Sequence, residues 1–211
     1  MFFLQFFQNP LGIVIFLVML VITVTVHEWA HAKAADELGD PTAEMEGRLT
    51  LDPRAHLDPL GSLMFLIAGF GWGKPVPFDP YNLRNPHRDS ALIAFAGPFS
   101  NAVMASVAAV ILFFAKKYTG STPALFAQAL LPLFISLNIR LGIFNLLPFA
   151  PLDGFKVVGG LLPKEQSREW YSLERYGIYF LLFFILPFTG GKSMLELFIV
   201  PVIDFLQKIL V

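Results

Sequence analysis

Two histidines and a glutamate lie within one five-residue segment, His27-Glu28-Trp29-Ala30-His31. Side chains four positions apart share one face of a helix, so the two imidazoles can bind the same metal ion. Glu28 follows the first of them, where its carboxylate can reach a metal-bound water and act as a general base. Because zinc lowers the pKa of its bound water to about 7, the segment predicts hydrolysis of a peptide bond by a zinc-activated water.

Chance is the competing explanation for this segment. An accidental match to H-E-x-x-H is expected in roughly one of a few hundred chains of this length. Here the three residues stand at the end of a run, residues 11–26, that contains no charged residue. Ionisable groups at membrane depth are costly unless they face a cavity, a metal or one another, so the position favours a functional site.

A catalytic zinc ion needs a third protein ligand and one open position. The sequence has no cysteine, so that ligand must be His, Asp or Glu. Asp153 lies in an apolar stretch interrupted by prolines, and broken backbone of this kind is tolerated at membrane depth where it lines a cavity. Asp153 could equally be the N-cap of a helix over 154–162. Glu44 and Glu46 are alternative carboxylate ligands.

The elements that must hold these residues are predicted to be membrane helices. A first helix runs from Leu11 through His31 to about Leu38, and clear spans follow at 91–115 and 123–147. Residues 171–188 and 194–210 are a fourth and a shorter fifth candidate. The sequence therefore predicts an all-α polytopic membrane protein with about five transmembrane helices, in one domain over 1–211 with a catalytic core at 11–162.

The region between the first two clear spans is predicted to be irregular. Residues 45–51 alternate in polarity, which is typical of a short strand or hairpin. Residues 61–70 are apolar but too few to span, and the glycines and prolines after them favour a re-entrant or interfacial segment. We expect segment 61–77 to act as a gate for substrate entry, since its glycines permit motion.

Composition places the chain in a bilayer and excludes some partners. Hydrophobic residues make up 55% of it and charged residues 15%, whereas an average soluble domain is about one quarter charged. A net charge of -1 leaves no basic stripe for phosphates, so nucleic acid is excluded as a partner. The N-terminal residues lack the positive region of a cleaved signal peptide, so we expect a retained first span in the plasma membrane.

The distribution of lysine and arginine predicts the orientation of the five spans. If residues 38–90 face the cytoplasm, three lysines lie outside and Arg140 lies within the third span, where it can snorkel, pair with an acid or meet substrate. The eleven cationic residues on the inner side would be Lys33, Arg48, Arg54, Lys74, Arg84, Arg88, Lys156, Lys164, Arg168, Arg175 and Lys208, against Lys116, Lys117 and Lys192. This bias predicts an outside N-terminus and an active site near the cytoplasmic face.

Three further segments extend the pattern around H-E-x-x-H. They are Gly97-Pro98-Phe99-Ser100-Asn101, then Asn145-x-x-Pro148-x-x-x-Leu152-Asp153-Gly154, and Trp72-Gly73-Lys74-Pro75-Val76-Pro77. Over residues 11–162 the chain resembles the site-2 protease family of intramembrane metalloproteases. The resemblance implies that His27, His31 and Asp153 bind one zinc ion and that Glu28 is the catalytic acid/base. It also implies cleavage of single-pass membrane proteins, often regulators whose soluble part is then released.

The same resemblance bears on two asparagines. Asn145 would hold substrate backbone or stabilise the oxyanion, although a structural hydrogen bond at the broken helix end is an equal alternative. Asn101 is a second candidate for substrate or oxyanion binding, and a structural role is favoured for it. Gly97-Pro98 is interpreted as a kink or close-packing point between helices. Phe155 stands where many relatives have a second glycine, and 211 residues leave no room for the PDZ or CBS modules of relatives.

Two other functional classes compete with a protease. A membrane metal-ion transporter should present metal-capable groups along a path, yet His, Asp and Glu are nearly absent from residues 91–152. A non-catalytic zinc-binding membrane protein would not need Glu28. The sequence therefore favours an intramembrane zinc endopeptidase that acts on the transmembrane segment of another membrane protein.

Overall fold

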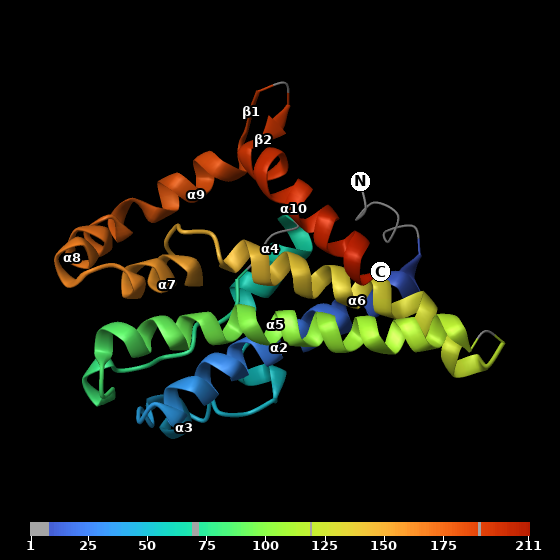
Figure 1. The fold of residues 1–211 in the computed structure, drawn as a ribbon, viewed down its shortest axis with the longest axis horizontal. Coiled ribbons are helices and arrows are strands. Elements are labelled where there is room, and N and C mark those ends of the chain that lie inside the picture. Colours follow the sequence, from blue (N-terminus) through green and yellow to red (C-terminus); the bar gives the residue numbers. More distant parts are fainter. Residues whose placement is uncertain (1–8, 69–71, 119, 190) are drawn as a thin grey trace.

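Three long helices form the centre of the molecule. The computed structural model describes residues 9–68, 72–118, 120–189 and 191–211, and it is mostly helical (Figure 1). Within these residues, three helices are long and apolar enough to cross a membrane: α2 (Pro10–Glu37), α5 (Pro86–Lys117) and α6 (Thr122–Asn145). They correspond to the three clear spans that the sequence predicts.

The ends of these helices follow from local sequence. Asn9 caps α2 by accepting hydrogen bonds from the backbone amides of Leu11 and Gly12, and Pro10 takes the first helical position. Beyond its last turn, Gly39 adopts a φ of 104°, which glycine allows without strain. α5 begins five residues before the predicted span because its first turn, from Pro86, is polar and extends beyond the apolar segment.

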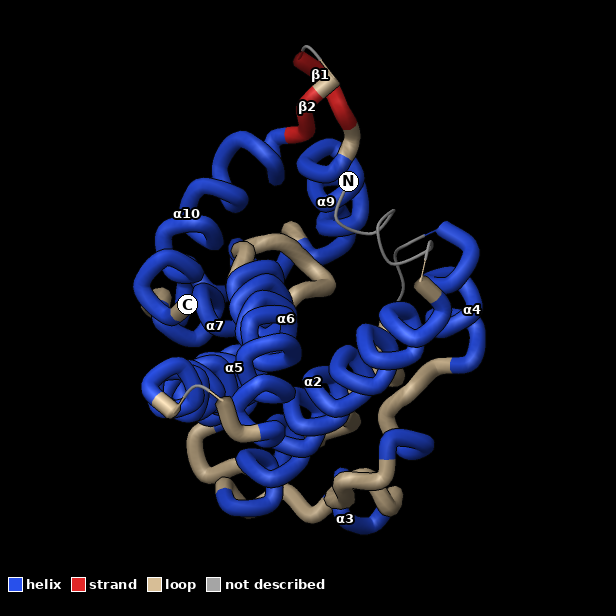
Figure 2. The backbone as a smooth tube through the Cα atoms, turned by 90° about the vertical axis from the view of Figure 1, so that its right-hand side faces the viewer, coloured by secondary structure: helices blue, strands red, loops and turns tan. Residues whose placement is uncertain are grey.

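α5 packs against both α6 and α2, and the latter two also contact each other (Figure 2). Small residues let the helices approach closely. Asn101 of α5 fills the space beside Gly142 of α6. A Cβ added at Gly142 would lie 3.3 Å from the Cβ of Asn101. Further along, a buried cluster joins α5 and α6 to the last helix of the chain. Its members are Ala105, Ala108, Leu112, Ile135, Ile139 and Ile203.

The connection between α2 and α5 consists of short helices and turns. They are α3 (Thr42–Met45), η1 (Pro53–Ala55), α4 (Pro59–Ala68) and η2 (Pro80–Asn82). The predicted strand over 45–51 is wrong, because Gly47 turns with a φ of 68° and the Arg48 amide closes back on the carbonyl of Ala43. α4 has ten residues and is therefore about 15 Å long at 1.5 Å per residue. This is too short to cross a membrane, in agreement with the prediction for residues 61–70. Residues 69–71 of the proposed gate lie outside the described residues.

Asp40 ties this connection to the end of α2. Its buried carboxylate accepts hydrogen bonds from the backbone amide of Asp79 at 2.7 Å and from the side-chain amide of Asn82 at 2.8 Å, as well as from Thr42. Burial raises the pKa of Asp40, but these hydrogen bonds outweigh it and leave the pKa below its usual value. The carboxylate is therefore ionised and holds η2 against the helix that carries His27 and His31.

The C-terminal part is more broken than the sequence predicts. It contains α7 (Asp153–Leu161), α8 (Lys164–Ser172), η3 (Glu174–Tyr176), α9 (Gly177–Ile185), β1 (Pro187–Thr189), β2 (Lys192–Ser193) and α10 (Met194–Leu210). β1 and β2 form an antiparallel pair, with Pro187 opposite Ser193, that projects away from the helices (Figure 2). Of the fourth predicted span, only the nine residues of α9 are one apolar helix, so five separate spans are not confirmed.

α10 continues along the bundle in the direction of α9 and lies beside α6. Gln207 on α10 donates a 2.6 Å hydrogen bond to the hydroxyl of Ser136 on α6, and the Lys116 ammonium at the end of α5 bonds the carbonyl of Val211. The C-terminus therefore lies at the same end of the bundle as Lys116. The prediction that Lys208 lies on the opposite side of the membrane from Lys116 is not confirmed, because α9 and α10 are short and together pass along the bundle once (Figure 1).

Candidate metal centre

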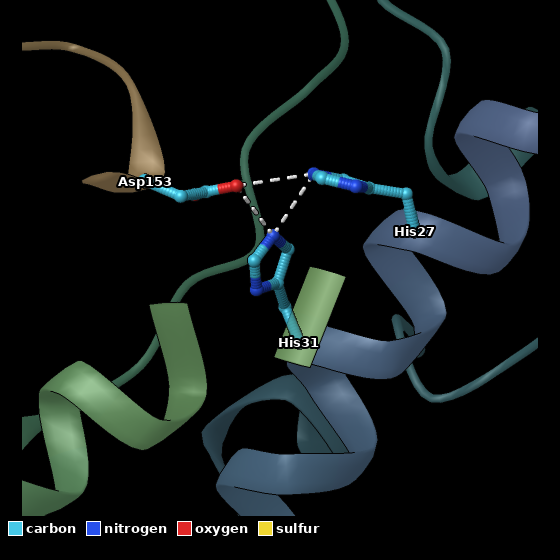
Figure 3. A group of neighbouring side chains, drawn as sticks. All are labelled: His27, His31 and Asp153. Carbon is cyan, nitrogen blue, oxygen red and sulfur yellow. Dashed lines mark hydrogen bonds and ion pairs between the residues drawn. The ribbon is translucent and has the colours of Figure 1, made fainter. Parts of the chain in front are cut away.

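Three side chains from two distant parts of the chain converge in the bundle (Figure 3). The Nε2 atoms of His27 and His31, one turn apart on α2, are 3.1 Å from each other. Oδ2 of Asp153, the first residue of α7, lies 3.2 Å from each of them. Both histidines are buried and Asp153 is largely so. The structure thus brings together the three residues expected to bind zinc.

The position of Asp153 depends on the residue that follows it. A Cβ at Gly154 would lie 2.2 Å from the carbonyl oxygen of Leu146 and 2.5 Å from that of Leu147, so only glycine fits where α7 starts against the end of α6. The N-cap of α7 is Leu152, and no side chain makes a capping hydrogen bond. The carboxylate of Asp153 is therefore directed at the histidines and not at its own helix.

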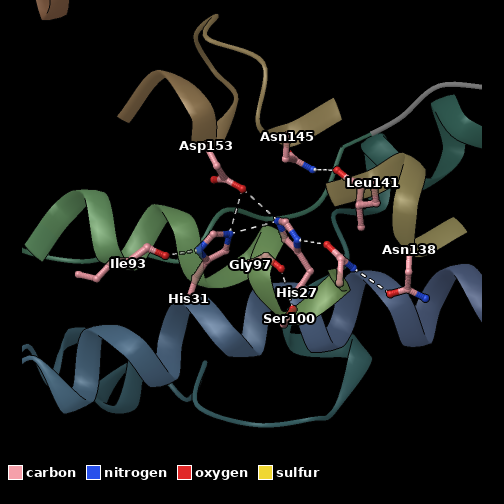
Figure 4. Close-up of polar contacts among 10 residues, drawn as sticks. His27, His31, Ile93, Gly97, Ser100, Asn138, Leu141, Asn145 and Asp153 are labelled. Atoms are coloured by element: carbon pink, nitrogen blue, oxygen red, sulfur yellow. Dashed lines mark hydrogen bonds and ion pairs between the residues drawn. The ribbon is translucent and has the colours of Figure 1, made fainter. Parts of the chain in front are cut away.

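Hydrogen bonds on the far side of the rings determine which nitrogen faces Asp153. Nδ1 of His31 lies 2.7 Å from the backbone carbonyl of Ile93, and Nδ1 of His27 lies 2.7 Å from Oδ1 of Asn101 (Figure 4). A carbonyl oxygen only accepts, so Nδ1 of His31 carries a proton, and in the neutral imidazole Nε2 then presents a lone pair. Asn101 presents its oxygen to His27 in the same way.

The resulting cluster fits a cation. Two Nε2 lone pairs and a carboxylate oxygen face one another, and the buried Oδ2 of Asp153 receives no hydrogen bond. Three acceptors at this separation repel one another unless a positive charge lies between them. Ligand atoms about 2.0 Å from a tetrahedral zinc ion are about 3.3 Å apart, close to the separations observed here.

Asp153, and not Glu44 or Glu46, is the carboxylate that lies beside the two histidines. Among the described residues, His27, His31 and Asp153 are the group of metal-capable side chains that the structure brings together. Glu44 and Glu46, the alternative ligands, are exposed on and beside α3.

Gly97 of α5 allows the histidines to sit where they do. A Cβ at this position would lie 2.3 Å from Nε2 of His31 and 2.7 Å from Cε1 of His27, so no side chain can be accommodated. The sequence interpretation of Gly97-Pro98 as a close-packing point between helices agrees with this contact. The sequence interpretation did not identify the imidazoles of His27 and His31 as the groups that pack against Gly97.

Glu28 lies beside Gly73, the first residue of segment 73–75. A Cβ at Gly73 would lie 3.4 Å from Oε1 of Glu28. The segment is held from both sides: the amide of Lys74 donates to the carbonyl of His56 at 2.8 Å, and Arg48 donates to the carbonyls of Lys74 at 2.5 Å and Pro75 at 3.3 Å. Burial lowers the pKa of Arg48, and the charge of Glu28 acts in the opposite direction, so the two groups interact electrostatically.

The remaining predicted residues differ in their surroundings. Asn145, half-buried at the end of α6, donates to the carbonyl of Leu141 at 3.0 Å. Asn101 is fully buried against His27, which favours the structural role. Arg140 is exposed and donates to Ser136 at 3.1 Å, and in the described part of the chain no acidic side chain pairs with it.

Sequence reasoning missed two residues near the centre. Asn138 is a fully buried amide on α6 that bonds Asn101, and Arg48 is the buried cation that holds segment 73–75. An amide inside an apolar span is a signal that could have identified Asn138. No local pattern marks Arg48, because its partners are 26 and 27 residues away.

Comparisons with known proteins agree with this chemistry. The model of peptidase family M50 matches residues 15–188. A Bacillus subtilis (strain 168) protein named "Putative zinc metalloprotease YwhC" is 37% identical over 209 residues, covering 92% of this chain and 95% of that protein. "Putative zinc metalloprotease Rip2" of Mycobacterium tuberculosis (strain ATCC 25618 / H37Rv) is 31% identical over 180 residues, covering 81% of this chain and 66% of Rip2. No solved structure matches the chain significantly.

Proposed function

This chain belongs to peptidase family M50, the site-2 protease family, and is a zinc metalloprotease; we propose that it hydrolyses peptide bonds in or beside the transmembrane segments of other membrane proteins. Three long apolar helices support a location in the lipid bilayer. The observation that carries the proposal is the convergence of His27, His31 and Asp153 at separations of 3.1 to 3.2 Å between those helices and α7.

In this proposal His27, His31 and Asp153 hold one zinc ion per chain through Nε2, Nε2 and Oδ2. When bound, the ion supplies a water of lowered pKa and polarises the scissile carbonyl. Glu28 accepts the proton of the attacking water on a carboxylate oxygen and delivers it to the departing amine nitrogen. Asn145 stands near the start of α7 and donates its amide to substrate backbone or to the developing oxyanion.

The substrate is a membrane protein with a transmembrane segment, and cleavage releases its soluble part. Most of the lysines and arginines lie in the segments that join the helices at the active-site end, which supports a site towards the cytoplasmic side of the plasma membrane. A transporter is not favoured, because the described residues bring together one group of metal-capable side chains and not a series along a path.

Zinc content and cleavage tested together separate these roles. We would measure zinc in purified wild type, Glu28→Gln and Asp153→Ala, and assay each on a model transmembrane substrate. About one zinc in wild type and Glu28→Gln, little in Asp153→Ala, and cleavage by wild type only are expected from a three-ligand catalytic site. Glu44→Ala is the matched control and should keep both zinc and activity. A wild type without zinc, or cleavage by Glu28→Gln, would reject the mechanism.

A further inference from the structure

A continuous row of buried polar side chains leads away from the metal centre. Nδ1 of His27 lies 2.7 Å from Oδ1 of Asn101, Nδ2 of Asn101 lies 3.0 Å from Oδ1 of Asn138, and Nδ2 of Asn138 lies 3.2 Å from the hydroxyl of Thr23. Asn101, Asn138 and Thr23 have no exposed surface at all. The row therefore passes from α2 through α5 to α6 (Figure 4), and the bond from Asn138 to Thr23 returns it to α2.

The backbone carbonyl of Phe134 determines which way the side-chain amide of Asn138 is turned. Its Nδ2 donates a 2.9 Å hydrogen bond to the backbone carbonyl of Phe134, one turn earlier on α6. A backbone carbonyl cannot donate, so the nitrogen and not the oxygen of the Asn138 amide must face it. Oδ1 of Asn138 consequently faces Asn101 and can only accept.

The orientation of the Asn138 amide fixes that of Asn101 and, through Asn101, the tautomer of His27. Because Oδ1 of Asn138 only accepts, Asn101 must present Nδ2 to it and turn its own Oδ1 towards His27. That oxygen in turn requires Nδ1 of His27 to carry a proton, which in the neutral imidazole leaves a lone pair on Nε2 beside Asp153. The fixed carbonyl of Phe134 thus selects the tautomer of His27, as the carbonyl of Ile93 does directly for His31.

We infer that Asn138 is a positioning residue of the metal centre, which holds His27 in its metal-binding tautomer by fixing the amide of Asn101. The inference rests on the metal centre proposed above. Without Asn138, the amide of Asn101 can rotate and present Nδ2 to His27 Nδ1. The imidazole then favours the tautomer with its proton on Nε2, which cannot bind a metal.

A purely structural role is the alternative, since buried amides also hold membrane helices together. The two roles differ in what they predict for folded protein. A residue that only joins helices affects stability, whereas one that orients a ligand affects metal affinity, by about 10- to 100-fold for partners of this kind. Gln128 offers a matched control, because it also joins α6 to α5, through a 2.8 Å bond to the carbonyl of Ala115, and has no link to His27.

The test is zinc affinity, measured by competition with a chromophoric chelator, in wild type and three variants. Asn138→Leu should bind zinc about 10- to 100-fold more weakly. Asn138→Asp should stay within about threefold of wild type, because a buried neutral carboxylic acid can donate to Phe134 and accept from Asn101 as the amide does. Gln128→Leu should bind as wild type does. Wild-type affinity in Asn138→Leu, or an equal loss in Gln128→Leu, would overturn the inference.

Nitrogen-15 NMR of histidine-labelled, zinc-free wild type gives a second readout that needs no variant to fold. The row predicts that His27 is protonated on Nδ1, and predominant protonation on Nε2 would overturn it. This measurement also separates the two proposals. A wild type that binds no zinc contradicts the proposed function, whereas zinc binding without the Nδ1 tautomer contradicts only the role of Asn138.

Discussion

The absence of a side chain at residue 97 leaves the space that the two histidines of the candidate metal centre fill. α5 approaches α2 so closely that the imidazoles of His27 and His31 occupy the volume of a missing Cβ. The same contact places the carbonyl of Ile93, one turn before Gly97, within 2.7 Å of His31. One glycine therefore allows both the approach of the helices and the orientation of a ligand.

Gly97→Ala should consequently weaken zinc binding by at least about tenfold. The added methyl group would displace one or both imidazoles, so that their Nε2 atoms no longer point at the metal position. Affinity would be measured by chelator competition on folded protein in detergent. Ala102→Leu, which enlarges an exposed position of the same helix, is the control and should bind as wild type does. Unchanged affinity in Gly97→Ala would show that the rings can move without loss of the site.

Local residue patterns identified the three side chains that meet in the candidate metal centre, and they missed the residues that support these side chains. His27 and His31 are related by helical spacing alone, so H-E-x-x-H identifies them without knowledge of the fold. Asp153 could be proposed because metal chemistry required a carboxylate and few were available. Asn138 and Arg48 act through partners on other elements, and the Thr23–Asn138 bond spans 115 positions, so no window of sequence contains their role.

At the scale of elements, helix length and apolarity were sufficient for α2, α5 and α6 because both are local properties. The same reasoning was insufficient near the C-terminus, where residues 171–188 are apolar on average yet divide into η3, α9 and β1. It was wrong for 45–51, where alternation suggested a strand but Gly47 reverses the chain. A turn that depends on one glycine or on a distant partner cannot be predicted from the period of hydrophobic residues.

Arg48 is a buried cation that holds segment 73–75 beside Glu28. Arg48→Gln should lower kcat about tenfold or more and leave zinc content unchanged. The segment would lose two charge-assisted hydrogen bonds, and small displacements close to the reacting groups lower the rate strongly. Arg48→Lys keeps the charge without the two-point contact and should recover little activity. Cleavage kinetics and zinc analysis on the same preparations provide the measurement.

Arg54→Gln is the control for this experiment. Arg54 lies in the same connection but is exposed and paired with Asp52, whose exposed carboxyl has its pKa lowered to about 2 by that pairing. Its loss should leave kcat within about twofold of wild type, since exposed ion pairs contribute little. Full activity in Arg48→Gln, or an equal loss in Arg54→Gln, would mean that the hold of Arg48 on the segment does not matter for catalysis.

For the whole molecule, the contact between Lys116 and the carbonyl of Val211 places the C-terminus beside the end of α5. The end of α5 and the end of α10, which five alternating spans would separate, instead lie together, and α8 lies at the other end of the bundle (Figure 1). Since the natural sequence has no cysteine, a single introduced cysteine can be labelled without background.

We therefore predict that cysteines introduced at Lys117 and Val211 react with a membrane-impermeant maleimide from the same side of the membrane, and that a cysteine at Lys164, the first residue of α8, reacts from the opposite side. The reason is that α9 and α10 cross the bundle together once, so the chain from 164 to 211 changes sides. Intact cells and inverted vesicles give the two sides separately, and cleavage activity of each variant controls for folding. Labelling of 164 and 211 from one side would restore five alternating spans and require α10 to turn away from the end of α5.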